Sequence, residues 1–209
     1  MQEQLINKFL SEMVLPKTKY KKPFIIALSG YSGSGKSFVA RLFSSNLGIY
    51  IIAGDKVRGY LYKINYSDNF YTINDLTNKI TDLRIKKALD NNIPIVLDRS
   101  ISSVEQLDKL KKYNVDIIFI KLNSTHEENI KRILFKKDKR EDKEINNIYG
   151  DTGHYSGVSS IEIYNEIKER KVYDVPDNIF DYQINTLEGL KAIEERVNYI
   201  SAEILKKYK

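Results

Sequence analysis

A glycine-rich stretch at residues 30–37 constrains this sequence more than any other feature. It reads GYSGSGKS and fits the pattern G-x-x-x-x-G-K-[ST] without a mismatch. An apolar run at 24–28 precedes it directly, and a helix-forming stretch at 36–47 follows. Such a loop surrounds phosphate groups with backbone N–H groups, and it needs glycine wherever a Cβ would block the turn or the phosphate. The feature predicts a buried strand, a phosphate-binding loop and a helix in direct succession.

The loop assigns chemistry to individual positions. Lys36 supplies a cation to the β- and γ-phosphates, Ser37 supplies a hydroxyl to Mg²⁺, and the helix N-terminus adds partial positive charge. No guanine-reading motif follows the fourth apolar run, where residues 121–124 read KLNS, so ATP is favoured over GTP. We expect the nucleotide to be bound by Gly30, Gly33, Ser34, Gly35, Lys36, Ser37 and Phe38.

Short apolar runs alternate with helical periodicity along the rest of the chain. The predicted strands are 24–28, 49–53, 93–97, 115–120 and, more weakly, 182–184. The predicted helices are 3–13, 36–47, 73–90, 103–112, 125–138, 159–170 and 187–207. Continuous apolar runs of this length are typical of strands buried on both faces. The alternation therefore predicts an α/β fold with three layers, in which helices cover both faces of a parallel sheet.

Length and composition set the broader limits. A chain of 209 residues suits one compact domain, which we place at 24–209 after an N-terminal helix and basic connector at 1–23. The polar stretch at about 132–158 is the predicted lid.

The absence of cysteine excludes disulfides and thiolate metal sites. No apolar run reaches about 18 residues, so we expect a cytoplasmic protein without a membrane segment. The net charge of +6 suits anionic ligands without identifying a partner.

A carboxylate and a guanidinium follow the second predicted strand. Asp55 and Arg58 lie three residues apart, beside the phosphate-binding loop, at the sheet edge where open α/β sheets bind ligands. Asp55 can orient an acceptor hydroxyl and take its proton, while Arg58 can hold an anionic part of the acceptor. The alternative is structural: Asp55 caps a short helix and Arg58 is solvated.

Three further charged positions belong to the same hypothesis. Asp98 ends the third predicted strand and, if that strand neighbours the first, lies near Ser37 and serves the Mg²⁺ shell; alternatively it pairs with Arg99 or caps the next helix. Arg132 and Arg140 share one helical face at a spacing of eight residues, where their charge can stabilise a phosphoryl transition state. The alternative for these arginines is an ordinary solvated helix face.

These motifs resemble the small P-loop kinases that include polynucleotide 5′-hydroxyl kinase, adenylylsulfate kinase and zeta-toxin-like kinases, a group with an AAA-type ATP-binding domain. The resemblance rests on residues 29–37, 54–58 and 95–98 and on the basic helix after the fourth strand. It implies a five-stranded sheet of order 2-3-1-4-5, a general base at Asp55, an acceptor-binding arginine at Arg58 and a basic helical lid. Many relatives have a small residue, Thr and Asn after the aspartate, whereas this chain has RSI at residues 99–101.

The expected function is an ATP-dependent, Mg²⁺-requiring kinase acting on a hydroxyl of a small molecule or of a nucleic-acid end. Its catalytic residues are then Lys36, Asp55, Arg58, Arg132 and Arg140, and its metal residues are Ser37 and Asp98. Two alternatives stay open: a polynucleotide 5′-hydroxyl kinase specifically, or a regulatory P-loop ATPase or nucleotide-binding module without kinase activity. The expected partners are a small-molecule phosphoryl acceptor or a nucleic-acid 5′ end, and the chain is expected to be a monomer or homodimer.

Overall fold

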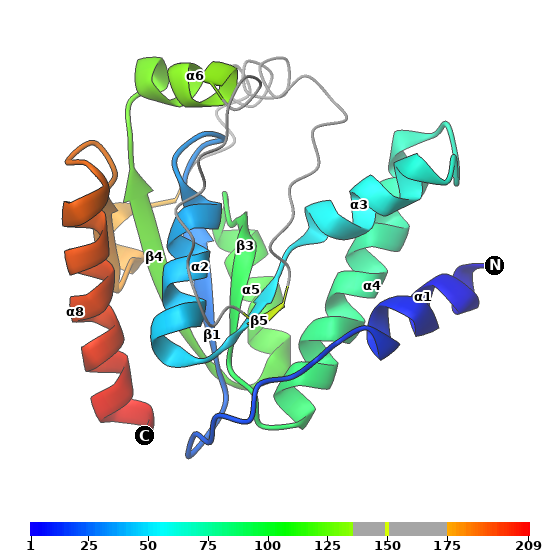
Figure 1. Cartoon of the computed structure of the whole chain (residues 1–209), viewed down its shortest axis with the longest axis horizontal. Coiled ribbons are helices and arrows are strands. Elements are labelled where there is room, and N and C mark those ends of the chain that lie inside the picture. The colour runs from blue at the N-terminus through cyan, green and yellow to red at the C-terminus, as the bar shows by residue number, and fades with distance from the viewer. Residues whose placement is uncertain (136–148, 151–174) are drawn as a thin grey trace.

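A parallel sheet forms the centre of the molecule (Figure 1). The computed structural model describes residues 1–135, 149–150 and 175–209. The strands are β1 (Phe24–Ser29), β2 (Tyr50–Ile52), β3 (Ile95–Ser100), β4 (Asp116–Asn123), β5 (Tyr149–Gly150) and β6 (Tyr182–Asn185). Their order is β5-β2-β3-β1-β4-β6, and all neighbours run parallel. The five predicted strands and their 2-3-1-4-5 order are confirmed, with β6 as the fifth.

The short strand β5 is a departure from the predicted arrangement. No periodicity indicated it, and its two residues fall inside the stretch predicted as a lid. Backbone pairing of Tyr50 with Tyr149 and of Ile51 with Gly150 adds these residues to the sheet beside β2. A strand this short has no pattern of its own, because its position is fixed by hydrogen bonding to a neighbour that is distant in sequence.

The central strand β1 shows why an uninterrupted apolar run belongs here. Successive side chains of a strand point to opposite faces. Phe24, Ile26 and Leu28 pack into one hydrophobic cluster, while Ile25 and Ala27 pack into another on the opposite face. All five are fully buried. Both faces of the sheet are therefore covered, as the sequence predicts for a parallel sheet.

Helices cover the two faces (Figure 1). Helices α2 (Lys36–Leu47) and α8 (Leu190–Tyr208) contribute Val39 and Val197 to the first cluster. Helices α4 (Phe70–Asp90) and α5 (Val104–Leu110) contribute Ile85 and Leu110 to the second. These layers confirm the three-layer α/β fold. Two short 3-10 helices, η1 (Lys111–Tyr113) and η2 (Asp177–Ile179), lie in the connections. The helix predicted over 159–170 lies outside the described residues.

A third, smaller cluster lies away from the sheet. Helix α3 (Gly54–Lys63) follows β2 and packs against α4, and α1 (Gln2–Ser11) packs across α4. The cluster consists of Leu5, Phe9, Val57, Leu61, Ile73, Leu76 and Ile80, all buried. Helix α4 begins at Phe70, three residues before the predicted start, because the Asn69 side chain caps it by accepting a hydrogen bond from the Tyr71 amide at 2.8 Å. The α3–α4 pair is therefore a helical unit with its own apolar centre.

Helix α6 (His126–Phe135) lies over the carboxyl ends of the strands (Figure 1). Its predicted continuation over 136–138 lies outside the described residues. Among the helices that the structure describes, none is both long and apolar enough to span a membrane.

Candidate active site

The phosphate-binding loop joins β1 to α2 and has the backbone that its glycines allow. Gly33 has φ +83° and Gly35 has φ +93°, in the left-handed region that favours glycine. A Cβ on Gly33 would lie 2.5 Å from the carbonyl oxygen of Asn129 in α6, closer than real Cβ contacts. Gly35 is the N-cap of α2 and, as a glycine, offers no side chain to cap this helix. The first-turn amides of α2 therefore suit an anion such as phosphate.

Lys36 lies across this loop. Its ammonium donates hydrogen bonds to the carbonyl oxygens of Gly30 at 2.8 Å and Tyr31 at 2.7 Å. The Gly30 carbonyl also accepts a hydrogen bond from the Ser100 hydroxyl of β3 at 2.9 Å, which fixes the loop from the neighbouring strand. Because an ammonium has three donors, phosphate oxygens are natural further or alternative partners for Lys36.

Ser37 and Asp98 meet as the sequence predicts. The Ser37 hydroxyl donates to the Asp98 carboxylate at 3.1 Å, across 61 residues of sequence. The contact depends on an irregularity in β3: Ala27 pairs with Leu97, whereas the next residue, Leu28, pairs with Ser100. Asp98 and Arg99 thus leave the regular register at the carboxyl end of the strand. The cap of α5 is Ser103, which accepts from the Gln106 amide, so the alternative that Asp98 caps this helix is wrong.

The Ser37–Asp98 pair fits a magnesium site. Mg²⁺ is a hard cation that prefers oxygen ligands, and it is usually held by few protein groups together with waters and substrate phosphates. A hydroxyl and a carboxylate within hydrogen-bonding distance supply such oxygens beside the phosphate-binding loop. Across the described ranges no group of three or more His, Cys, Asp or Glu residues forms a denser metal site.

Asp55 and Arg58, which the sequence analysis predicts to contact a phosphoryl acceptor, lie together on α3. Asp55 lies in the first turn of α3, whose N-cap is Ala53, so the alternative that Asp55 caps the helix is wrong. The Arg58 guanidinium donates to the Asp55 carboxylate at 2.5 Å and, through its other terminal nitrogen, to the side-chain oxygen of Asn74 in α4 at 3.2 Å. The Asp55 side chain is 54% exposed and that of Arg58 is 29% exposed. The two groups are fixed relative to each other and remain accessible to a small molecule.

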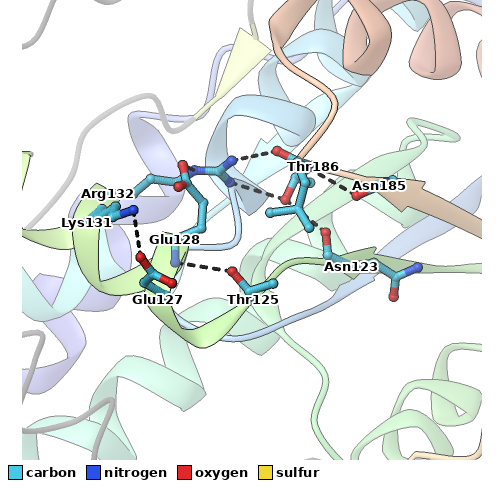
Figure 2. A network of polar contacts seen from close by, with 9 residues as sticks. Asn123, Thr125, Glu127, Glu128, Lys131, Arg132, Asn185 and Thr186 are labelled. Atoms are coloured by element: carbon cyan, nitrogen blue, oxygen red, sulfur yellow. Dashed lines mark hydrogen bonds and ion pairs between the residues drawn. The ribbon is translucent and has the colours of Figure 1, made fainter.

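Arg132 lies at the end of α6 that the structure describes, and its transition-state role stays a prediction. Its guanidinium donates to Glu128 at 2.9 Å, to the Thr186 hydroxyl at 3.2 Å and to the Thr186 carbonyl at 2.5 Å (Figure 2). Thr186 in turn donates its hydroxyl and its amide to the Asn123 carbonyl at the end of β4. Arg132 therefore joins α6 to the segment between β6 and α8. One of its terminal nitrogens lies 4.0 Å from where a Cβ of Gly35 would be. Arg140 lies outside the described residues.

The sequence patterns missed Asn74 and Thr186. Neither belongs to a motif, since each reaches the site through the packing of a separate element: Asn74 through α4 against α3, and Thr186 through the segment after β6 against α6. A weak signal existed for Asn74, which is a polar position directly after buried Ile73 and one turn before buried Thr77 on an otherwise amphipathic helix. Thr186 follows the last strand without any pattern that distinguishes it from a turn residue.

The three groups of side chains occupy one edge of the sheet. The loop follows β1, Asp98 lies at the end of β3, and Asp55 follows β2. Because these strands are parallel, their carboxyl ends meet at the same edge, where open α/β sheets bind ligands. The fold and this edge define a P-loop nucleotide-binding protein with the strand order of the P-loop kinases.

Comparison with known proteins agrees with this class. Residues 25–147 match the AAA domain family, and because this is more than half of the chain, the chain belongs to that family. No curated protein matches the sequence. Helix α1 and the segment from β6 to α8 lie outside the matched residues.

Several solved structures share the fold. A gluconokinase from Sinorhizobium meliloti has a TM-score of 0.55 at 16% identity, covering 91% of this chain and 97% of that one. The Mycobacterium tuberculosis APS kinase in complex with AMPPNP and APS has a TM-score of 0.52 at 16% identity, covering 88% and 96%. An Acinetobacter baumannii shikimate kinase in complex with shikimate has a TM-score of 0.54 at 16% identity, covering 90% and 95%. At these identities the likeness establishes the P-loop kinase fold.

Proposed function

We propose that this protein is an ATP-dependent, Mg²⁺-requiring kinase that transfers the γ-phosphoryl group to a hydroxyl of a small-molecule acceptor. One observation carries the proposal: the phosphate-binding loop and the Asp55–Arg58–Asn74 cluster follow strands whose carboxyl ends share one sheet edge. A nucleotide-binding module needs the first group only. The second group, the Asp55–Arg58–Asn74 cluster, suits a phosphoryl acceptor, because such an acceptor needs a base for its hydroxyl and a contact for its remaining groups.

In this mechanism each residue has a defined task. Lys36 and the amides of the loop and of the first turn of α2 hold the phosphates. Ser37 and Asp98 hold Mg²⁺, which supplies neutralising charge to the phosphate oxygens when bound. Asp55 accepts the proton of the acceptor hydroxyl. The hydroxyl oxygen forms the new bond to the γ-phosphorus, while the bond from this phosphorus to the bridging oxygen, which leaves with ADP, breaks.

Arg58 is suited to an acceptor that carries a negative charge. Its guanidinium already makes one hydrogen bond to a carboxylate and one to an amide, which holds its plane in a fixed direction. Its Nε is buried and has no hydrogen-bond partner among the described residues. An anionic group of the acceptor that binds Arg58 would also draw the guanidinium from Asp55 and so leave that carboxylate available as the base. We therefore expect anionic alcohols to be better acceptors than neutral ones.

The test is ADP production from ATP and Mg²⁺ by purified protein across a panel of acceptors: nucleosides, adenylylsulfate, neutral sugars, sugar phosphates, aminoglycosides and 5′-hydroxyl oligonucleotides. The expected result is stimulation by one acceptor class with one phosphorylated product per ADP. Lys36→Ala is the blank. Release of inorganic phosphate without any acceptor, at a rate that no acceptor changes, would contradict the proposal and favour a regulatory ATPase.

A further inference from the structure

Asn129 of α6 has a buried side chain that the mechanism above does not use. The residue is fully buried, and neither its side-chain oxygen nor its side-chain nitrogen has a hydrogen-bond partner among the described residues. Its neighbour one turn on, Arg132, has all three of its guanidinium nitrogens in hydrogen bonds. Burying a polar group without a partner is costly, and such groups in a native fold call for an explanation.

The position of Asn129 relates it to the phosphate-binding loop. A Cβ on Gly33 would lie 2.5 Å from the Asn129 carbonyl oxygen and 3.0 Å from its Cα, so the backbones of loop and helix are in contact there. Ser34, the next residue of the loop, is also fully buried, and its hydroxyl also lacks a partner in the described part of the chain. The loop and the helix that contacts it thus each carry a buried side chain without a hydrogen-bond partner among the described residues: a hydroxyl in the loop and a carboxamide on α6.

The loop has a reason to change its hydrogen bonds when nucleotide binds. Its carbonyls at Gly30 and Tyr31 accept from the Lys36 ammonium, and phosphate oxygens compete for the same donors. Helix α6 is held to the segment after β6, because Arg132 hydrogen-bonds Thr186. A small shift of the loop relative to the helix therefore changes the surroundings of Asn129, because the two backbones are in contact there.

We propose that Asn129 is a nucleotide-linked positioning residue, whose carboxamide hydrogen-bonds the phosphate-binding loop at Gly33 and Ser34 when nucleotide occupies the loop. The unliganded protein carries the cost of the unpaired amide, and the nucleotide complex does not. By linkage, this difference contributes to nucleotide affinity and couples the loop to α6. The inference rests on the nucleotide-binding part of the proposed function and is independent of transfer to an acceptor.

The test uses Asn129→Leu, which keeps the size of the side chain and removes its polar atoms. The unliganded variant should unfold at a higher temperature than the wild type, because an unpaired buried amide has been replaced by an apolar group. Its affinity for Mg²⁺ with β,γ-imido-ATP, measured by titration calorimetry, should fall about tenfold, the effect of one lost hydrogen bond of this kind. Opposite signs in the two measurements are the signature of the proposed role.

Two controls complete the experiment. Asn78→Leu replaces an exposed asparagine of α4. This control should not reproduce the higher unfolding temperature or the lower nucleotide affinity expected of Asn129→Leu. In the wild type, the side-chain NH₂ resonances of Asn129 should shift on addition of Mg²⁺ and β,γ-imido-ATP, a measurement that needs no variant to fold. Unchanged resonances, a lower unfolding temperature of unliganded Asn129→Leu, or unchanged nucleotide affinity would each overturn the proposal. The kinase proposal fails separately, in the acceptor panel.

Discussion

The phosphate-binding loop and the α3–α4 unit meet at one sheet edge but are built in different ways. The loop is defined by backbone: glycines with positive φ, a helix start without a side-chain cap and a lysine that bonds to loop carbonyls. The α3–α4 unit is defined by side chains on two ordinary helices, with a separate apolar cluster that α1 completes through Leu5 and Phe9. The loop, which is the proposed donor half of the site, therefore depends on backbone conformation, whereas the α3–α4 unit, which is the proposed acceptor half, depends on side-chain packing.

The largest expected effect lies in the donor half. Lys36→Ala removes the cation that faces the phosphates, and loss of one such preorganised electrostatic contact lowers turnover by about 10³. Steady-state kinetics with the acceptor found in the panel provides the measurement, and the exposed Lys191→Ala should leave turnover unchanged. If Lys36→Ala retains turnover within a few-fold of the wild type, the loop is not the donor site.

The next prediction tests whether the α3–α4 unit can be destabilised without affecting the phosphate-binding loop. Phe9→Ala empties a buried position of the α1–α3–α4 cluster, where its ring makes an edge-to-face contact with Tyr60 at 5.5 Å between ring centroids. A buried Phe→Ala substitution costs about 3 kcal/mol. Hydrogen exchange should accelerate in α3 and α4, while affinity for β,γ-imido-ATP stays unchanged. Phe70→Ala, at a residue 47% exposed, is the control. Equal acceleration in α2 would show that the two halves unfold as one unit.

Asp55→Asn tests the proposed base without altering the size of the side chain. Turnover should fall by about 10² because general-base catalysis contributes roughly this factor. Nucleotide affinity should be unaffected, since Asp55 lies on the acceptor side. The exposed Asp75→Asn on α4 serves as the matched control. A turnover of Asp55→Asn close to that of the wild type would remove this carboxylate from the mechanism.

Asn74→Ala sharpens the acceptor half further. It removes the hydrogen bond that holds one terminal nitrogen of Arg58, and a hydrogen bond to a charged group is worth about tenfold or more in binding. The expected result is an acceptor KM about tenfold higher at nearly constant kcat. Asn78→Ala on the same helix should show the wild-type KM. A fall in kcat with constant KM would instead place Asn74 in the chemical step.

The smallest effect concerns neither half. Hydrogen bonds from Lys22 and then from Tyr208 hold the pKa of the Asp116 carboxyl below its usual value. A carboxylate with a depressed pKa stabilises the fold above its unfolded pKa, and this contribution is lost as pH falls through the folded pKa. Urea unfolding of the wild type and Asp116→Asn should therefore differ at pH 6 and converge toward pH 2. A constant difference across this range would show that the charge of Asp116 is immaterial.

The contrast between the loop and the α3–α4 unit also explains which parts of the fold and of the site could be predicted from the sequence. The glycine-rich motif and the alternation of apolar runs predict the loop and the five main strands, because these depend on local backbone geometry and strand burial. The strand order 2-3-1-4-5 came from the resemblance to the P-loop kinases, and the structure has it. Asp98 near Ser37 followed from adjacency of two strands, and the structure has this contact. The predicted role of Arg132 did not anticipate Thr186, since that contact depends on how the segment after β6 returns to α6.

The acceptor side marks the limit of pattern analysis. Asp55 and Arg58 are close in sequence and were found, whereas Asn74 reaches Arg58 only through the packing of α4 on α3. Strand β5 was missed because its two residues carry no periodicity and their place is fixed by pairing with β2. Sequence patterns describe neighbours within one element, and both misses depend on how one element packs or pairs with another.

The Arg132–Thr186 contact has a consequence for biosynthesis. During synthesis the phosphate-binding loop is made first, Arg132 follows, and Thr186 is added 54 residues after Arg132. A ribosome that has completed the loop, β4 and α6 therefore holds a nascent chain in which this contact does not yet exist. The attachment of α6 to the segment after β6 therefore forms late in synthesis, after the phosphate-binding loop and the Asp55–Arg58–Asn74 cluster have been made.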